Sequence, residues 1–167
     1  NAINGFIAGN FDRVPEGVQG TAIDNVFTEG EDITPREGHP GQDHRGWGWD
    51  FSQDGRLIRN AIVKDNIFAH CRARDCRSML ASYPDTRIEN NIVWKWPSRS
   101  PEFLPNSPGP FKDPERTLAT YNASLGRENS FEAFATELRK QAKTNWREEY
   151  TAQRIIAYFR EGFSPAP

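Results

Sequence analysis

The residue types with the most potential for chemistry gather between positions 39 and 50. This stretch holds two of the three histidines of the chain, together with Arg45 and two tryptophans. Cleavage of a uronate polymer by β-elimination needs a base that removes the proton next to the carboxylate, and a cation that neutralises that carboxylate. We predict His44 as the base and Arg45 as the cation. The alternative is a polar loop in which these side chains bond the backbone.

Metal binding by the same stretch is less well supported. His39, Asp43 and His44 do not follow a recognisable zinc-ligand spacing. Asp24, Asp43 and Asp50 carry the hard oxygen ligands that calcium prefers, although nothing in the pattern specifies it. The sequence therefore predicts no certain cofactor, with calcium as an open alternative. A nucleophilic serine or cysteine with a positioned base is not recognisable either.

Tryptophans are candidate sugar-binding groups. Trp47 and Trp49 are two residues apart, which on a strand places both side chains on one side. Exposed indoles in such a row stack on sugar rings. Packing is an equally weighted alternative for this pair, and it is the favoured one for Trp94 and Trp96, which adjoin Pro97.

Basic residues near the two cysteines form a candidate surface for an acidic polysaccharide. They are Lys64, Arg72, Arg74 and Arg77. The alternative is that these side chains solvate a loop or pair with Asp75. His70 and Tyr83 are further acid–base candidates on residue type alone.

Cys71 and Cys76 lie five residues apart. We predict a small disulfide loop, of the kind found in secreted proteins, which stabilises the fold by roughly 2 kcal/mol in a loop-entropy estimate. Two unrelated thiols are the alternative. A zinc site is disfavoured because only His70 adds an adjacent ligand.

A six-residue pattern that recurs three times indicates how these groups are positioned. It consists of an apolar residue, any residue, Asp or Asn, a constant Asn, a branched apolar residue, and Phe or Val. The copies are Ala22–Phe27, Val63–Phe68 and Ile88–Val93. Their Asn residues are 41 and 25 positions apart, which suits coils of a β-solenoid that become stable only when stacked. We predict that Asn25, Asn66 and Asn91 occupy equivalent corners of stacked parallel strands and hydrogen-bond one another.

Composition limits the classes of partner. Hydrophobic residues make up 36% and mean hydropathy is −0.78, which suits a thin core. The balance of 21 basic and 23 acidic residues argues against a nucleic-acid or anionic-membrane binder. The chain starts within a strand-like unit without an initiator Met or a signal peptide. We therefore expect an upstream part of the same protein to cover its open edge.

Three segments follow one another along the chain. Residues 1–96 read as the parallel strands. Residues 97–114 contain six prolines and read as a crossover linker. Residues 115–167 read as a helical cap packed on the strands, because helices this short are marginal alone.

Capping signals set the expected helices. The first begins at Asp113–Pro114 and ends near Gly126. The second is capped by Asn129 or Ser130, with Glu132 as the capping-box partner of Asn129. The third is capped by Thr151 and ended by Gly162 as the first residue past the helix.

Several segments resemble a known family. The tail segments Lys112–Gly126, Gln141–Arg147 and Tyr158–Phe163, preceded by units such as Asp65–Phe68 and Asn90–Val93, are similar to secreted bacterial right-handed parallel β-helix proteins of the pectate-lyase-like kind. The resemblance implies a mainly β fold, the last coils of a right-handed parallel β-helix with a small α-helical cap. It also implies a polysaccharide lyase or another carbohydrate-active protein. No lyase motif matches residue by residue.

The sequence thus predicts an extracellular, bacterial protein that recognises an acidic polysaccharide, with β-elimination left undecided. The first alternative is a non-catalytic carbohydrate-binding or adhesion protein. The second is a structural piece of an enzyme whose active site lies upstream.

Overall fold

The computed structural model describes residues 2–3, 21–29, 47–49, 62–72, 77–78, 87–96 and 105–167. The chain divides into two compact units. The first consists of residues 3–107, and the second of residues 108–167 with the first two residues. The division falls inside the predicted linker, and the predicted packing of the helices on the strands stays a prediction.

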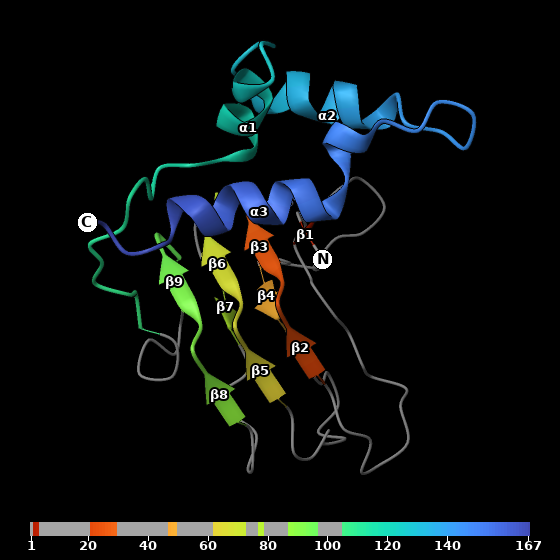
Figure 1. Ribbon diagram of the computed structural model, residues 1–167. Coiled ribbons are helices and arrows are strands. Elements are labelled where there is room, and N and C mark those ends of the chain that lie inside the picture. The colour runs from red at the N-terminus through yellow and green to blue at the C-terminus, as the bar shows by residue number, and fades with distance from the viewer. Residues whose placement is uncertain are drawn as a thin grey trace, which may run out of the picture. The chain divides into compact units, whose positions relative to one another are not determined.

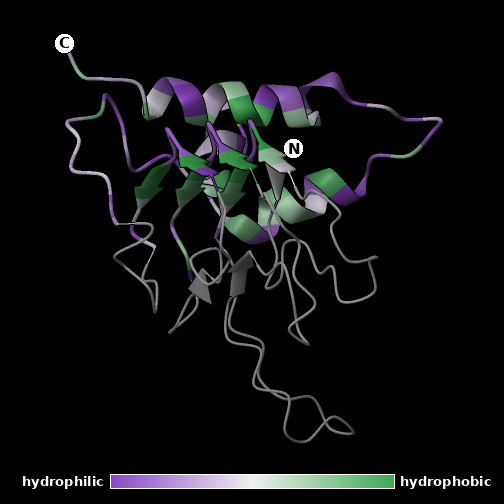
Figure 2. Ribbon diagram, turned by 90° about the horizontal axis from the view of Figure 1, so that it is seen from below, coloured by the Kyte–Doolittle hydropathy of each residue, from purple (hydrophilic) through white to green (hydrophobic). Residues whose placement is uncertain are grey.

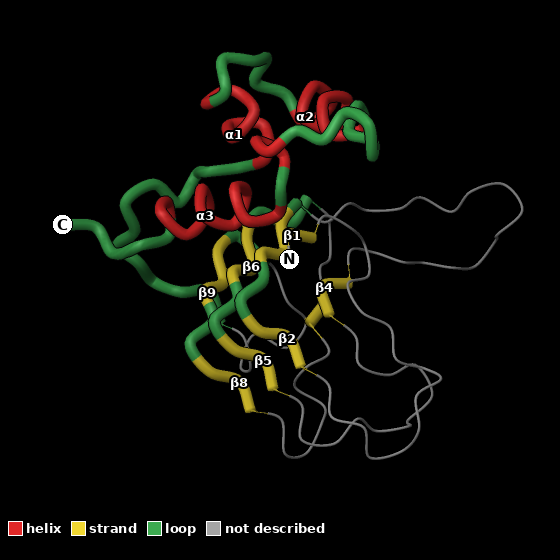
Figure 3. Tube along the Cα trace, turned by 45° about the vertical axis from the view of Figure 1, so that its right-hand side comes forward, coloured by secondary structure: helices red, strands yellow, loops and turns green. Residues whose placement is uncertain are grey.

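The first unit is built from short parallel strands (Figure 1). One sheet has the order β1 (Ala2–Ile3), β3 (Val26–Thr28), β6 (Ile67–Ala69) and β9 (Ile92–Trp94). A second has the order β2 (Thr21–Ile23), β5 (Ile62–Lys64) and β8 (Arg87–Glu89), and a third pairs β4 (Trp47–Trp49) with β7 (Arg77–Ser78). Short turns lead from β2 to β3, from β5 to β6 and from β8 to β9 (Figure 3).

The pairing register stacks like residues of the sequence pattern. Phe27 pairs with Phe68, which pairs with Val93. The rings of Phe27 and Phe68 stack with centroids 4.8 Å apart and planes 7° apart. Trp96 meets the Phe68 ring edge-on at 5.9 Å and is buried. The favoured packing role of Trp96 is therefore confirmed, and these apolar side chains form the core between the strands.

The predicted fold class is wrong. Within the described residues helix outweighs strand, so the protein is not mainly β. Strands of two or three residues form separate small parallel sheets and not a continuous right-handed parallel β-helix. The physical reason is that the strand-forming pattern is confined to three short copies, whereas side-chain caps and apolar periodicity make about half of the second unit helical.

Four helical elements form the second unit. They are α1 (Leu118–Ser124), α2 (Phe131–Arg139), the 3₁₀ turn η2 (Glu148–Tyr150) and α3 (Ala152–Gly162). Ser130 caps α2 and Thr151 caps α3, as predicted. The first helix begins later than predicted, because Thr117 and Thr120 cap each other's backbone N–H groups.

Two predictions about the other helix ends are also wrong. The N–H that the α2 cap accepts belongs to Ala133, so Glu132 is not the partner of an Asn129 capping box. Gly162 lies inside α3, and Phe163 is the C-cap. A Cβ on Gly162 would lie 2.5 Å from Arg116 Cδ, so close packing requires glycine there.

One side of α3 is buried. Hydrophobic and hydrophilic residues alternate along this helix (Figure 2). Ile155 and Phe159 are its buried apolar side chains, and Phe163 packs edge-on against Phe111 at 5.4 Å. Among the described helices, none combines the length and the hydrophobicity needed to cross a bilayer.

Candidate functional site

A column of three asparagines holds the strands of the first unit in register. Asn66 Oδ1 accepts hydrogen bonds from the backbone N and the Nδ2 of Asn25, both at 3.0 Å. Asn91 Oδ1 accepts the equivalent bonds from Asn66 at 3.0 and 2.9 Å. Each Nδ2 also donates to a carbonyl of the preceding strands. The predicted stacking of the three asparagines is confirmed, and it fixes which residues become neighbours farther along.

Three ionisable residues follow the asparagine column four positions later. Glu29, His70 and Lys95 come directly after β3, β6 and β9. All three have left-handed backbone conformations, with φ of 53°, 56° and 50°. The same conformation recurs at Asp24, Asp65 and Asn90, in the turns before these strands, so it belongs to the repeated unit. The ends of these strands are the candidate site because three ionisable residues follow one another there.

Backbone hydrogen bonds between neighbouring strands continue in the same register at these three positions. The N–H of Glu29 donates to the carbonyl of Ala69 at 3.2 Å, and the N–H of His70 donates to that of Trp94 at 3.0 Å. Neighbouring strands in a sheet are about 4.8 Å apart, so the three ionisable residues form a closely spaced column. Glu29 is buried, His70 is half-buried with its Nε2 inaccessible, and Lys95 is exposed.

A second basic residue, Arg72, follows the segment whose backbone bonds Lys95. The N–H of Cys71 donates to the carbonyl of Lys95 at 3.2 Å, which keeps the two chain segments side by side beyond the strands. Arg72 follows Cys71 and is exposed. We call His70, Arg72 and Lys95 the strand-end basic cluster. Exposed guanidinium and ammonium groups gathered in this way attract carboxylates and sulfates.

Much of the predicted site lies outside the described residues. The residues concerned are His39, Asp43, His44, Arg45, Asp50, Arg74, Cys76 and Tyr83. The predicted Cys71–Cys76 disulfide therefore stays a prediction. Among the residues that the structure does describe, no group of three His, Cys, Asp or Glu side chains is placed to hold a metal ion.

The remaining predicted binding residues do not all come together. Trp47 and Trp49 lie on β4, whose backbone pairs with Arg77 and Ser78 of β7. Lys64 lies on β5, where its Nζ is 3.8 Å from a carboxylate oxygen of Asp65. Of the predicted basic residues with described side chains, only Arg72 belongs to the strand-end basic cluster.

Sequence reasoning missed Glu29 and Lys95. A usable signal was present, because the fourth residue after the constant Asn is ionisable in every copy of the pattern. The six-residue pattern ends at the central residue of each strand, two positions before the ionisable residue.

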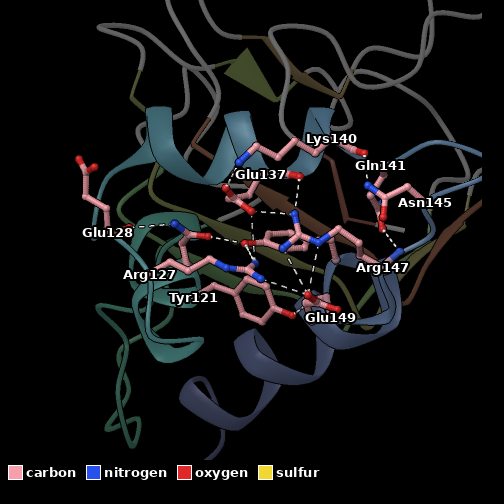
Figure 4. Close-up of polar contacts among 11 residues, drawn as sticks. Tyr121, Arg127, Glu128, Glu137, Lys140, Gln141, Asn145, Arg147 and Glu149 are labelled. Atoms are coloured by element: carbon pink, nitrogen blue, oxygen red, sulfur yellow. Dashed lines mark hydrogen bonds and ion pairs between the residues drawn. The ribbon is translucent and has the colours of Figure 1, made fainter.

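The charged side chains of the second unit form a different arrangement (Figure 4). Arg147 donates to a Glu137 carboxylate oxygen at 2.7 Å, and Arg127 donates to Glu149 at 3.2 Å. Both guanidinium groups lie over the Tyr150 ring, at 4.7 and 5.0 Å from its centroid. Each of the two arginines thus has carboxylate partners, which suits a structural role.

Hydrogen bonds in this network shift the pKa of its carboxyl groups. Those donated by Lys140 and Arg147 lower the pKa of Glu137 to about 2. The pKa of Glu149 is lowered by a backbone hydrogen bond and by the one from Arg127. Burial raises the pKa of Tyr121, whose hydroxyl donates to the carbonyl of Glu149. Both carboxylates are therefore held in their charged form.

No protein-family model, curated protein or solved structure compared with this chain matches it. The resemblance to pectate-lyase-like proteins therefore stays a prediction, and the fold class that it implied is corrected above.

Proposed function

We propose that the protein binds an acidic polysaccharide outside the cell through the strand-end basic cluster. The observation that carries the proposal is the gathering of His70, Arg72 and Lys95 where two parallel strands end. A uronate or sulfate group repeats along such a polymer, and a cationic edge recognises it through charge-assisted hydrogen bonds.

The rigidity of the site supports polymer recognition. The backbone beneath His70 and Lys95 is fixed by interstrand hydrogen bonds of 3.0 and 3.2 Å. The column of asparagines fixes the same strands four residues earlier. Groups held on rigid elements lose less conformational freedom when a ligand binds, so the fixed backbone at these positions favours binding.

The geometry favours binding over cleavage. A base for β-elimination has to reach the proton next to the sugar carboxylate, yet His70 Nε2 is inaccessible to solvent. An eliminative step would depend on His44 and Arg45, which lie outside the described residues. Non-catalytic binding is therefore the function that the described residues support best, and eliminative cleavage remains the hypothesis to be tested beside it.

A binding titration tests the proposal. The full chain is titrated with polygalacturonate, alginate and heparan sulfate by calorimetry at low and high salt. We expect an Arg72→Ala, Lys95→Ala double variant to lose affinity about tenfold, equivalent to about 1.4 kcal/mol, and we expect binding to weaken with salt. The matched control is an Arg139→Ala, Lys112→Ala double variant, which removes the same charges from the exposed surface of the second unit.

Equal losses in the two double variants would contradict the proposed site. Absence of binding to every polymer would contradict the function. Ultraviolet absorbance of an unsaturated product, followed in the same mixtures, tests cleavage. Product formation that His44→Ala abolishes would replace binding by a lyase function.

A further inference from the structure

Trp146 is the most exposed large apolar side chain of the described residues. Its relative exposure is 67%, against 49% for Ile23 and 36% for Leu138. Exposure of an indole to water is unfavourable. Burial of an aromatic side chain of this size stabilises a folded protein or a complex by roughly a few kcal/mol. Tryptophan is also one of the residue types enriched at binding hot spots.

The turn that carries Trp146 is anchored on both sides (Figure 4). Before it, Asn145 Nδ2 donates to the carbonyl of Lys140 at 3.0 Å, and the Asn145 N–H donates to that of Ala142 at 3.0 Å. After it, the Arg147 N–H donates to Gln141 Oε1 at 3.1 Å. The Arg147 guanidinium also bonds the Glu137 carboxylate. Trp146 is thus presented by a rigid turn, which lowers the entropy lost on binding.

Trp146 borders a hollow of about 510 Å³ at the start of α3. The other side chains that line it are Glu148, Thr151, Gln153 and Arg154. Within the described part of the chain, neither Glu148 nor Arg154 forms an ion pair through its side chain, in contrast to the paired charges of the neighbouring network. The hollow therefore offers one flat apolar face beside two charged side chains that form no ion pair with the described residues.

This lining suits a sugar ring better than a peptide. An apolar peptide anchor needs several aliphatic or aromatic walls, and here the indole is the sole apolar side chain. A pyranose has one flat C–H face for the indole and hydroxyls for Gln153 and Glu148. The Arg154 guanidinium can hold a carboxylate by two parallel hydrogen bonds.

The hollow that adjoins it is a poor site for an acidic sugar. Its volume is about 540 Å³, and it shares Glu148 and Arg154 with the first. Glu149 and Glu161 also line it, so three carboxylates face the space. Repulsion between like charges directs a uronate to the Trp146 side.

We infer that the helical unit carries a second saccharide subsite, in which a uronic acid ring stacks on Trp146 and its carboxylate binds Arg154. This inference rests on the proposed function, because the acidic polysaccharide supplies the ligand class. It adds a binding surface that is separate in sequence from the strand-end basic cluster.

Nuclear magnetic resonance of the full chain tests the subsite. The chain has five tryptophans, and Trp146→Phe identifies the indole N–H signal of Trp146. Addition of tetragalacturonate is expected to shift that signal together with the backbone amides of residues 148–154. We expect Trp146→Ala to weaken binding at these amides five- to tenfold, the range of a single stacking contact. Arg154→Ala should do the same, and Arg139→Ala, an exposed arginine on α2, should not.

The outcomes separate this inference from the proposed function. Shifts confined to residues 70–72 and 95 would overturn the subsite and leave the proposed function standing. Shifts at residues 148–154 that are equal with cellotetraose would overturn the role of Arg154 in choosing an acidic sugar. No shift with tetragalacturonate or with guluronate and mannuronate oligomers would overturn the subsite, whereas the proposed function would be overturned only if heparan sulfate also failed to bind.

Discussion

Replacement of Asn66 by alanine should destabilise the first unit more than any other single asparagine change in the described residues. The side chain is 1% exposed. Its Oδ1 accepts two hydrogen bonds from Asn25, and its Nδ2 donates to the carbonyl of Ala22 at 2.8 Å and to Asn91 Oδ1 at 2.9 Å. The variant removes all four bonds and leaves the buried backbone N–H of Asn25 without this acceptor.

The expected loss follows from the cost of these groups. Each hydrogen bond contributes about 0.5–1.5 kcal/mol net, and a buried donor left without an acceptor costs about 1–3 kcal/mol. Because these contributions overlap, we expect the free energy of unfolding to fall by about 3–5 kcal/mol. The free energy of unfolding of a small protein decreases by about 2 kcal/mol for each 1 M increase in urea. The urea concentration at the unfolding midpoint should therefore fall by about 2 M.

Urea unfolding followed by tryptophan fluorescence measures this change, because four of the five tryptophans lie in residues 3–107. Asn129→Ala, an exposed asparagine, is the matched control and should change stability by less than about 0.5 kcal/mol. Asn91→Ala should lie between the two, because Asn91 is only half-buried. A loss for Asn66→Ala no larger than that of the control would refute the view that the asparagine column stabilises the strands.

Three further changes test the second unit. Glu137→Gln should lower the unfolding temperature of the second unit at pH 7. Hydrogen bonds from Lys140 and Arg147 lower the pKa of Glu137 from 4.5 to about 2. The carboxylate therefore stabilises the fold above pH 4.5, and this stabilisation is lost as the pH falls toward 2. The difference from the wild type in thermal scans should therefore shrink over that range, and a constant difference would contradict it. Gly162→Ala should lower the free energy of unfolding by about 1–3 kcal/mol in chemical unfolding, because the alanine Cβ would lie 2.5 Å from Arg116 Cδ. This loss is expected although alanine favours helix. A stabilised variant would show that the contact relaxes. Thr151→Ala removes the cap of α3 and should cost about 1 kcal/mol, with Thr151→Ser restoring most of it.

Local hydrogen-bonding patterns were the part of the fold that could be predicted. The caps Ser130 and Thr151 bond backbone groups three residues away, so their spacing in the sequence is sufficient to identify them. The first helix shows the limit of this reasoning, because Asp113–Pro114 and Thr117 both offer cap signals. The reciprocal bonds between Thr117 and Thr120 decide the choice.

Fold class was not predictable from the repeated pattern alone. Three copies of a strand-forming unit are compatible with a long stack or with a few short strands, since each copy specifies only its own two strands. The number of residues that continue the pattern decides between these possibilities. In this chain the pattern stops before the second unit, where helix prevails.

The sequence by itself determined the asparagine column. Three asparagines occur in similar six-residue patterns, and stacking in register provides hydrogen-bond partners for their buried amide groups. The tertiary structure decided which charged groups meet. Glu29, His70 and Lys95 come together only through the strand register, and the hollow beside Trp146 exists only because an anchored turn precedes α3. The reason is physical: hydrogen bonds within a turn depend on nearby residues, whereas contacts between distant segments depend on the path of the whole chain.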